Sequence, residues 1–199
     1  MNNLQPKLDA FKQIVIENSN NENFTYREWF VKDHLMIVER IAIELCDKHP
    51  EADRAIVIAL VWFHDFGKSI DEANESEITK TKGVDAMRSV GLPEEFVQTV
   101  LNFWTRMEMK NEIDISQEAM EVQIISTADG ASHFVGKFYS SYFGDMPRES
   151  MATTEKILRK KITKDWERKI VLPEVKKAFL SRYHKALEIV GEYPEKSII

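Results

Sequence analysis

The chain has 199 residues, of which 43% are hydrophobic and 30% are charged, and its formal net charge at pH 7 is -6. This length favours one compact domain that needs no disulfide to stabilise its core, and the apolar content excludes a disordered chain. The negative charge argues against a dedicated binder of nucleic acids or anionic membranes, because such proteins gain affinity by neutralising phosphates.

Helical periodicity dominates the chain from end to end. Glycine and proline are scarce, at seven and six residues, and apolar residues recur at the spacing of a helix face. The pattern therefore predicts an all-α fold, a single-domain helical bundle over residues 1–199. Its motif-bearing core spans about residues 30–135, and C-terminal helices within residues 150–190 pack on that core.

The first helix with a clear inward face begins near Asp33. Its apolar stripe consists of Val38, Ile41 and Leu45. His34 lies on the same stripe, so its imidazole is predicted to face the core. Residues 52–63 are apolar on nearly every side, a pattern that fits either a buried strand or a buried helix. The length of this segment favours a central helix, with Gly67 as its C-terminal stop.

The middle of the chain alternates polar connections with helices. Residues 71–77 are acidic and polar and predict a loop, and residues 78–90 predict a weaker helix. A strong helix start follows at residues 92–95, with a proline in the first turn and acids at the positive end of the helix dipole. A later helix carries Asp129 on its apolar stripe, so this carboxylate is also predicted to point at the core.

Two further helices are predicted at residues 151–162 and 173–190. The aromatic residues before them could line a base-stacking pocket, although aromatics on helices more often pack in a core. These aromatics are Phe134, Phe138, Tyr139, Tyr142 and Phe143. A basic run interleaved with acids is typical of a solvated helix face. This run comprises Lys156, Arg159, Lys160, Lys161, Lys164, Arg168 and Lys169.

Cys46 is the single cysteine, which excludes an intramolecular disulfide and a thiolate-rich zinc site. The longest apolar run, residues 55–63, has nine residues, whereas a bilayer span needs about 20. No apolar signal region follows the N-terminus. We therefore expect a cytoplasmic protein without a nucleic-acid or membrane partner, and a homodimer stays possible.

Ionisable residues occur on the inward faces of three separate predicted helices. They are His34, the adjacent pair His64 and Asp65, and Asp129. A buried carboxylate is costly unless it is paired or coordinates a metal. Two imidazoles and two carboxylates suit one divalent ion among Mn, Fe, Co, Ni, Zn and Mg. Such a site leaves coordination positions for water and substrate, as a hydrolytic metal requires.

These motifs resemble the HD superfamily of metal-dependent phosphohydrolases over about residues 30–135. The resemblance rests on Asp33-His34, on His64-Asp65-Phe66-Gly67-Lys68 and on Ala128-Asp129-Gly130, whose order matches the metal-binding pattern of that family. It implies a helical fold, one metal, and Lys68 close to the substrate phosphate. The implied metal ligands are His34, His64, Asp65 and Asp129.

The chain also departs from relatives that bind two metals. Those proteins carry extra histidines where this chain has residues 79–82 and 103–105, so one metal is expected and the diiron oxygenase branch is not. Guanosine tetraphosphate hydrolases and deoxynucleotidases place an acid four residues after the motif histidine, where Lys68 stands here. Their catalytic acid cannot be assigned by position.

Several residues near the motifs are candidates for catalysis or for phosphate binding. Asp65 and Lys68 are joined by Asp71 and Glu72 as candidate catalytic groups, with a solvated loop as the plainer interpretation of the last two. The candidate substrate-binding residues are Lys68, Lys80, Lys82 and Arg106. His133, four residues after Asp129, could also reach the site, although a structural role is more usual.

The expected function is hydrolysis of a small phosphomonoester or phosphodiester, nucleotide-like in character, and the expected partner is that small phosphorylated substrate. A degenerate HD module that binds a nucleotide or a protein without turnover is the alternative. A third possibility is a structural helical bundle that binds no metal.

Overall fold

The computed structural model describes residues 4–145 and 150–191, and within those ranges the chain is helical and forms no strand. The predicted all-α fold class is therefore confirmed. Its α-helices are α1 (Gln5–Ser19), α2 (Met36–Lys48), α3 (Arg54–Phe63), α4 (Glu75–Ile78), α5 (Val84–Ser89), α6 (Glu94–Glu108), α7 (Met120–Ser132), α8 (Phe138–Asp145), α9 (Met151–Lys164) and α10 (Pro173–Ile189). Short 3-10 or π segments are η1 (Phe30–Leu35), η2 (Phe66–Ser69), η3 (Glu72–Asn74), η4 (Thr79–Gly83), η5 (Ile115–Gln117) and η6 (Asp165–Lys169).

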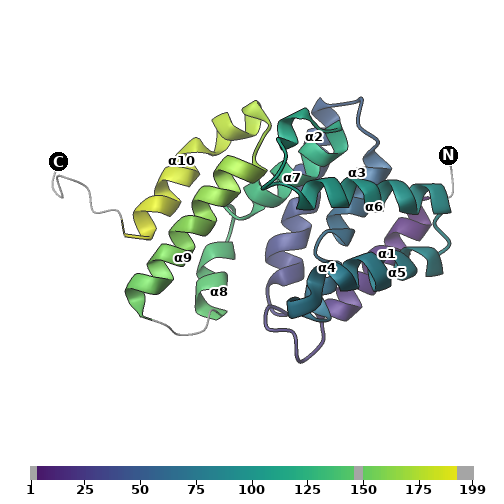
Figure 1. Cartoon of the computed structure of the whole chain (residues 1–199), viewed down its shortest axis with the longest axis horizontal. Helices are drawn as coiled ribbons and strands as arrows, with labels where there is room; N and C mark the ends of the chain where they lie inside the picture. The colour runs from purple at the N-terminus through teal and green to yellow at the C-terminus, as the bar shows by residue number, and fades with distance from the viewer. Residues whose placement is uncertain (1–3, 146–149, 192–199) are drawn as a thin grey trace.

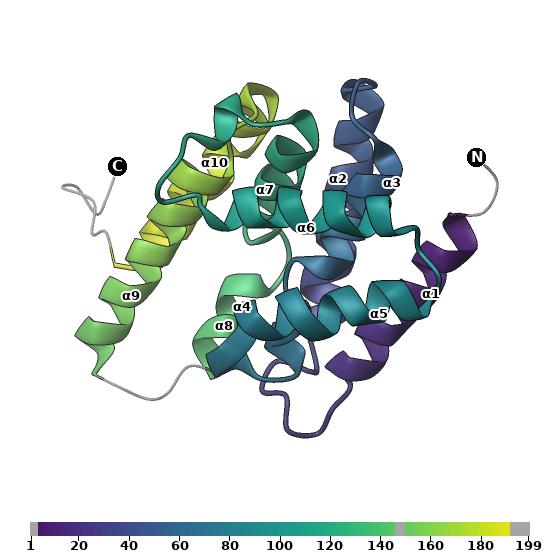
Figure 2. The ribbon, with the colours of Figure 1, turned by 45° about the vertical axis from the view of Figure 1, so that its right-hand side comes forward.

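The helices form two groups that meet at α7. Figure 1 shows α8, α9 and α10 side by side at one end of the molecule, and Figure 2 shows α9 still beside α10 after the turn. The other group contains α1 to α6. Helix α7 contacts α2, α3 and α6 on one side and η6 and α10 on the other. It therefore joins the two groups.

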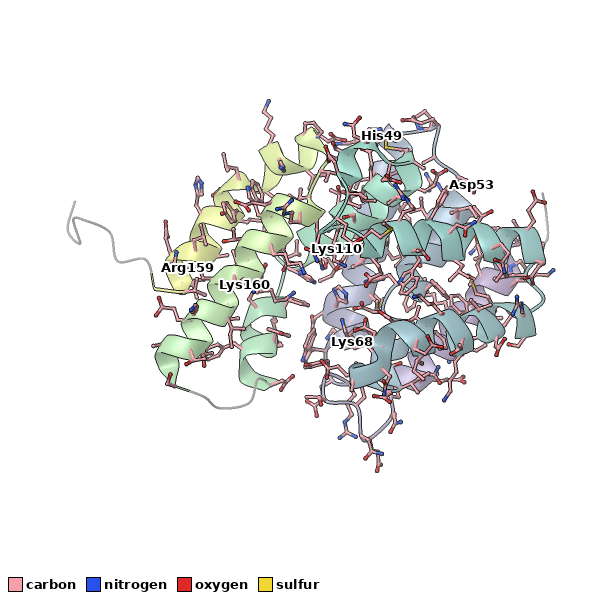
Figure 3. The ribbon with its side chains drawn as sticks, in the orientation of Figure 1. His49, Asp53, Lys68, Lys110, Arg159 and Lys160 are labelled. Carbon is pink, nitrogen blue, oxygen red and sulfur yellow. The ribbon has the colours of Figure 1, made fainter. Side chains whose placement is uncertain are left out.

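Helix α3 lies at the centre of the core, as the apolar run at residues 52–63 predicts. Seven of its ten residues are buried, and it contacts α1, α2, α6 and α7. Its start is fixed by Asp53, labelled in Figure 3, whose carboxylate accepts hydrogen bonds from the backbone N–H groups of Ala55 and Ile56. The buried helix therefore delivers His64, the residue directly after it, into the interior.

Two segments differ from the sequence expectations. Helix α1, for which we predict no element from the sequence, contacts α3 and buries Leu8, Phe11 and Val15. The segment 71–77, predicted to be a loop, is helical in η3 and α4. It is helical because the Asp71 carboxylate accepts from the backbone N–H groups of the next residues and so begins a helical turn.

Gly130 sets how closely η6 approaches α7. A Cβ atom at this position would lie 2.7 Å from the Cβ of Lys169 and 3.0 Å from Cγ1 of Ile170. Only a residue without a side chain permits this approach, and it brings Lys169 against the C-terminal part of α7.

Among the described residues, no helix combines the length and the apolar character needed to cross a bilayer.

Candidate metal centre

The four predicted ligand residues converge on one point inside the molecule. Nε2 of His34, in η1, is 3.4 Å from Oδ2 of Asp65 and 3.9 Å from Oδ1 of Asp129. Nε2 of His64 lies 3.7 Å and 4.0 Å from the same two oxygens. Residues separated by up to 95 positions therefore present nitrogen and oxygen atoms to a shared space.

Hydrogen bonds fix which nitrogen of each imidazole faces that space. Nδ1 of His64 lies 2.8 Å from the carbonyl oxygen of Val61 and can only donate to it. The hydroxyl of Ser132 donates to the carbonyl oxygen of Asp129 at 2.7 Å, so it accepts from Nδ1 of His34 at 3.1 Å. In the neutral form, both imidazoles therefore present the lone pair of Nε2 to the carboxylates, the arrangement typical of metal-ligating histidines.

A cation would satisfy these lone pairs. A nitrogen lone pair that faces a carboxylate oxygen is repelled unless a proton or a metal ion lies between the two atoms. Within the described part of the chain, Nε2 of His64 is buried and has no hydrogen-bond partner. Donor atoms within 4.8 Å of one another are offered by His34, His64 and Asp65 and, in a second set, by His34, Asp129 and His133. The donor set fits a divalent ion.

His133 belongs to this centre as well. Its Nδ1 lies 2.7 Å from Oδ2 of Asp165, and its Nε2 lies 3.3 Å from Oδ1 of Asp129. Burial lowers the pKa of His133 to about 3, so the imidazole is neutral near pH 7 and also presents a lone pair. The spacing of four residues after Asp129 was the sequence signal for this contact, although it did not establish a role.

Lysine side chains keep both carboxylates ionised. Nζ of Lys68 lies 2.8 Å from Oδ2 of Asp65, and Nζ of Lys169 lies 2.6 Å from Oδ2 of Asp129. Burial opposes ionisation, but the charges of Lys68 and Lys169 outweigh it and hold the pKa of Asp65 and that of Asp129 well below their usual range. Each carboxylate is therefore ready to bind a cation.

A cavity of about 150 Å³ opens onto these groups. Aromatic residues and polar or charged residues both line it. The aromatic ones are Tyr26, Trp29, Phe30, Phe138 and Tyr142. The polar and charged ones are His34, Asp65, Lys68, Glu72, Asp129, His133, Lys161 and Lys169.

Of the two candidate acids after Lys68, the structure brings only Glu72 to the cavity. Oε1 of Glu72 accepts a hydrogen bond of 2.9 Å from the Tyr26 hydroxyl at the cavity wall. The Asp71 carboxylate instead accepts from the backbone N–H groups of Ala73 and Asn74 and starts η3. The Asp71 side chain is therefore the N-terminal cap of η3, and this role accounts for its position.

The structure does not bring three of the predicted phosphate-binding residues to the cavity. Lys80 is exposed, with Nζ 5.7 Å from the ring centroid of Trp104. Lys82 is exposed beside a different groove, which also includes Ile14. Arg106 forms a two-bond ion pair with Glu118, in which the shorter contact is 2.5 Å.

The aromatic segment at residues 134–143 and the basic segment at residues 156–169 both contribute side chains to the cavity. The sequence pattern favours a core position for the first and a solvated helix face for the second. Phe138 and Tyr142 line it, whereas Phe134 packs in the interior and Phe143 is 41% exposed. A solvated face is the wrong interpretation for Lys161 and Lys169, which line the cavity with side chains 24% and 13% exposed.

Together, fold and site define an all-α protein with a buried histidine and carboxylate centre that could hold a divalent metal. Residues 31–132 match the family model described as "HD domain", which is just over half of the chain. The chain therefore belongs to the HD superfamily of metal-dependent phosphohydrolases. No curated protein and no solved structure gives a match.

Proposed function

We propose that the chain hydrolyses a small, nucleotide-like phosphate ester with one divalent metal bound by His34, His64, Asp65 and Asp129. The observation that carries the proposal is the convergence of these donors, with the Nε2 lone pair of His64 buried and unpaired among the described residues. Membership of the HD superfamily supports it independently.

The residues around the centre are suited to phosphate ester hydrolysis. A bound divalent ion would polarise a phosphoryl oxygen and lower the pKa of a water molecule. In the reaction, the water oxygen forms a bond to phosphorus and loses a proton, the phosphorus–oxygen bond of the ester breaks, and the leaving oxygen takes up a proton. Lys68, at the cavity wall, stabilises the negative charge that develops on the phosphoryl group. Glu72, whose carboxylate lines the cavity, would carry the proton from the water to the leaving oxygen.

The aromatic residues in the cavity lining support a substrate with a flat organic part. The rings of Phe138 and Tyr142 are stacked with an interplanar angle of 6°, and Trp29 meets the Phe138 ring edge to face at a centroid distance of 5.4 Å. Aromatic rings of this kind stack readily on a nucleobase.

The test combines metal analysis with an activity panel. We expect the purified protein to bind one equivalent of Mn, Co, Ni, Zn, Fe or Mg and to hydrolyse at least one phosphate ester in a broad panel. Substituting His64→Gln should abolish both properties, because it removes a donor from the centre. The matched control is His184→Gln, at an exposed histidine on α10.

The outcomes separate the proposal from its alternatives. Full turnover by the metal-free His64→Gln protein would reject the metal-dependent mechanism. Stoichiometric metal without turnover of any ester would favour an HD module that only binds a nucleotide or a partner protein. Absence of metal binding, together with a His64→Gln variant that changes stability alone, would favour a structural bundle.

A further inference from the structure

Three lysine side chains from three separate elements line the cavity beside the metal centre. Lys68 belongs to η2, Lys161 to α9 and Lys169 to η6. Their side chains are 26%, 24% and 13% exposed. Lys161 and Lys169 lie outside the segment that matches the HD family, so the metal-binding motifs alone do not account for them.

Lys161 and Lys169 share a buried carboxylate. Asp165 is 1% exposed, and its oxygens lie 3.3 Å from Nζ of Lys161 and 3.4 Å from Nζ of Lys169. The same carboxylate is already held by His133 and by the hydroxyl of Tyr139. Asp165 balances the charge of one ammonium group, and the other, that of Lys169, also pairs with Asp129, whose Oδ2 lies 2.6 Å from Nζ.

A bound divalent cation would change this balance. Asp129 and Asp65, partners of Lys169 and Lys68, would share their charge with the ion. Of the other nearby carboxylates, Glu72 lines the cavity and accepts from the Tyr26 hydroxyl, whereas Glu75 lies 3.8 Å from Lys68 outside the lining. The ion and the three ammonium groups would together carry more positive charge than the carboxylates of Asp65, Glu72, Asp129 and Asp165 carry negative charge. The lysine ammonium groups that face the cavity could therefore still bind an anion.

Lys161 is also held so that its ammonium group faces inward. Its Nζ lies 5.4 Å from the ring centroid of Phe138 and 5.4 Å from that of Tyr142, both of which line the cavity. The attraction between a cation and the faces of aromatic rings stabilises this position. Lys160, the preceding residue on α9, is instead exposed; Figure 3 labels both Lys160 and Lys68.

We propose that Lys161 and Lys169, together with Lys68, bind the terminal phosphoryl group of a phosphomonoester. This inference rests on the proposed function and narrows its substrate class. A phosphomonoester has three free phosphoryl oxygens and carries two negative charges near neutral pH, whereas a diester has two free oxygens and one charge. Three ammonium groups beside a divalent ion match the phosphomonoester, because each ammonium group can donate a hydrogen bond to a different phosphoryl oxygen.

The rival explanation is that the lysines are only counter-ions for Asp129 and Asp165. It predicts that their removal lowers stability or metal affinity but leaves phosphate binding by the loaded protein unchanged. The two explanations are distinguished by measuring anion binding and metal binding separately on the same variants.

The experiment is calorimetric titration of inorganic phosphate, and of dimethyl phosphate as the monoanionic probe, into the full-length protein saturated with Mn²⁺. The variants are Lys161→Gln and Lys169→Gln, and Lys160→Gln is the matched control. Metal content and thermal midpoint are recorded for each protein, and Lys161→Arg tests rescue by a retained positive charge. Turnover of p-nitrophenyl phosphate and of bis(p-nitrophenyl) phosphate is measured in parallel.

We expect each cavity variant to bind inorganic phosphate about tenfold more weakly, the loss typical of one charge-assisted hydrogen bond. The Lys160→Gln protein should match the wild type, Lys161→Arg should recover most of the affinity, and dimethyl phosphate should bind more weakly than inorganic phosphate to the wild type.

Unchanged phosphate affinity in both cavity variants at full metal content would overturn this inference. Preferential hydrolysis of the diester would also overturn it, although the proposed phosphohydrolase function would stand. Lysine-dependent phosphate binding without turnover of any ester would support this inference and contradict the proposed hydrolysis.

Discussion

Asp65 and Asp129 use their carboxylate oxygens in different ways. In Asp129, Oδ2 pairs with Lys169, while Oδ1 faces the nitrogen atoms of the histidines. In Asp65, the same oxygen, Oδ2, contacts both Lys68 and the histidine nitrogens. Lys68 would therefore compete with a cation for the Asp65 oxygen that faces the histidines, whereas Lys169 leaves the inward oxygen of Asp129 available.

This difference predicts the effect of removing Lys68 on metal affinity. In Lys68→Gln, the competing ammonium group is gone, so Mn²⁺ should bind more tightly, by roughly tenfold, the size of one charge-assisted hydrogen bond. Turnover should fall, because a charge beside the phosphoryl group is lost. Calorimetry and steady-state kinetics measure the two effects, with Lys82→Gln as the control for an exposed lysine. Weaker Mn²⁺ binding by Lys68→Gln than by the control would show that Lys68 supports Asp65 instead.

The single cysteine should be chemically inert in the folded protein. Cys46 is 5% exposed, and burial raises the pKa of its thiol, so little of the reactive thiolate is present. We expect native protein to react with a disulfide reagent at least about tenfold more slowly than guanidinium-unfolded protein. Equal rates in the two states would place Cys46 at the surface.

At the level of the elements, α7 contributes most to the site. Ten of its thirteen residues are buried, and it carries Asp129, the hydroxyl of Ser132 that orients His34, and Gly130, which admits η6. Helical periodicity predicted this helix and the inward direction of Asp129. It did not predict what packs against α7, because that depends on contacts between elements distant in sequence.

The same reason explains why the sequence predicts a solvated face for the basic residues of α9 and η6, whereas Lys161 and Lys169 line the cavity. Lys161, Asp165 and Lys169 are spaced four residues apart, so they share one helical face. Alternating charges on a helix usually indicate a solvated face, and only the packing of that face against α7 and α8 makes it part of a cavity. The sequence signal that could have found them is the acid Asp165, which lies four residues from each of the two lysines.

The close contact of α7 with η6 can be tested at Gly130. In Gly130→Ala, the new Cβ would lie 2.7 Å from the Cβ of Lys169, so one of the two elements must shift. We expect a loss of about 1–3 kcal/mol in the free energy of unfolding, as is typical of overpacking, measured by urea titration. Gly144→Ala on α8 is the control, because no atom lies within 4 Å of its added Cβ. Equal stability of the two variants would show that η6 accommodates the methyl group freely.

For the whole molecule, the metal centre should be a source of stability. Its donors come from η1, the end of α3 and α7, so a bound ion would link three segments that are far apart in the sequence. The motif order identified these donors correctly as neighbours, since helices that bury one face must direct the ionisable residues of those faces towards a common interior.

Metal binding is therefore expected to raise the thermal midpoint. A free metal concentration of 100 times the dissociation constant should add about 2.7 kcal/mol of stability, and for a chain of this size each kcal/mol corresponds to about 2–4 °C. Calorimetric scans with Mn²⁺ and with a chelator measure the shift. The His64→Gln variant should show no shift and His184→Gln a normal one; an equal shift in both would place the stabilising ion elsewhere.

The boundary of the HD match falls between two sets of cavity residues. The motif ligands lie within residues 31–132, whereas Lys161 and Lys169 come from α9 and η6 beyond it. Under our proposals, the metal ligands and two of the three phosphate-binding lysines thus come from different parts of the chain. A change confined to the C-terminal helices would then alter which substrate binds, while the metal ligands stay the same.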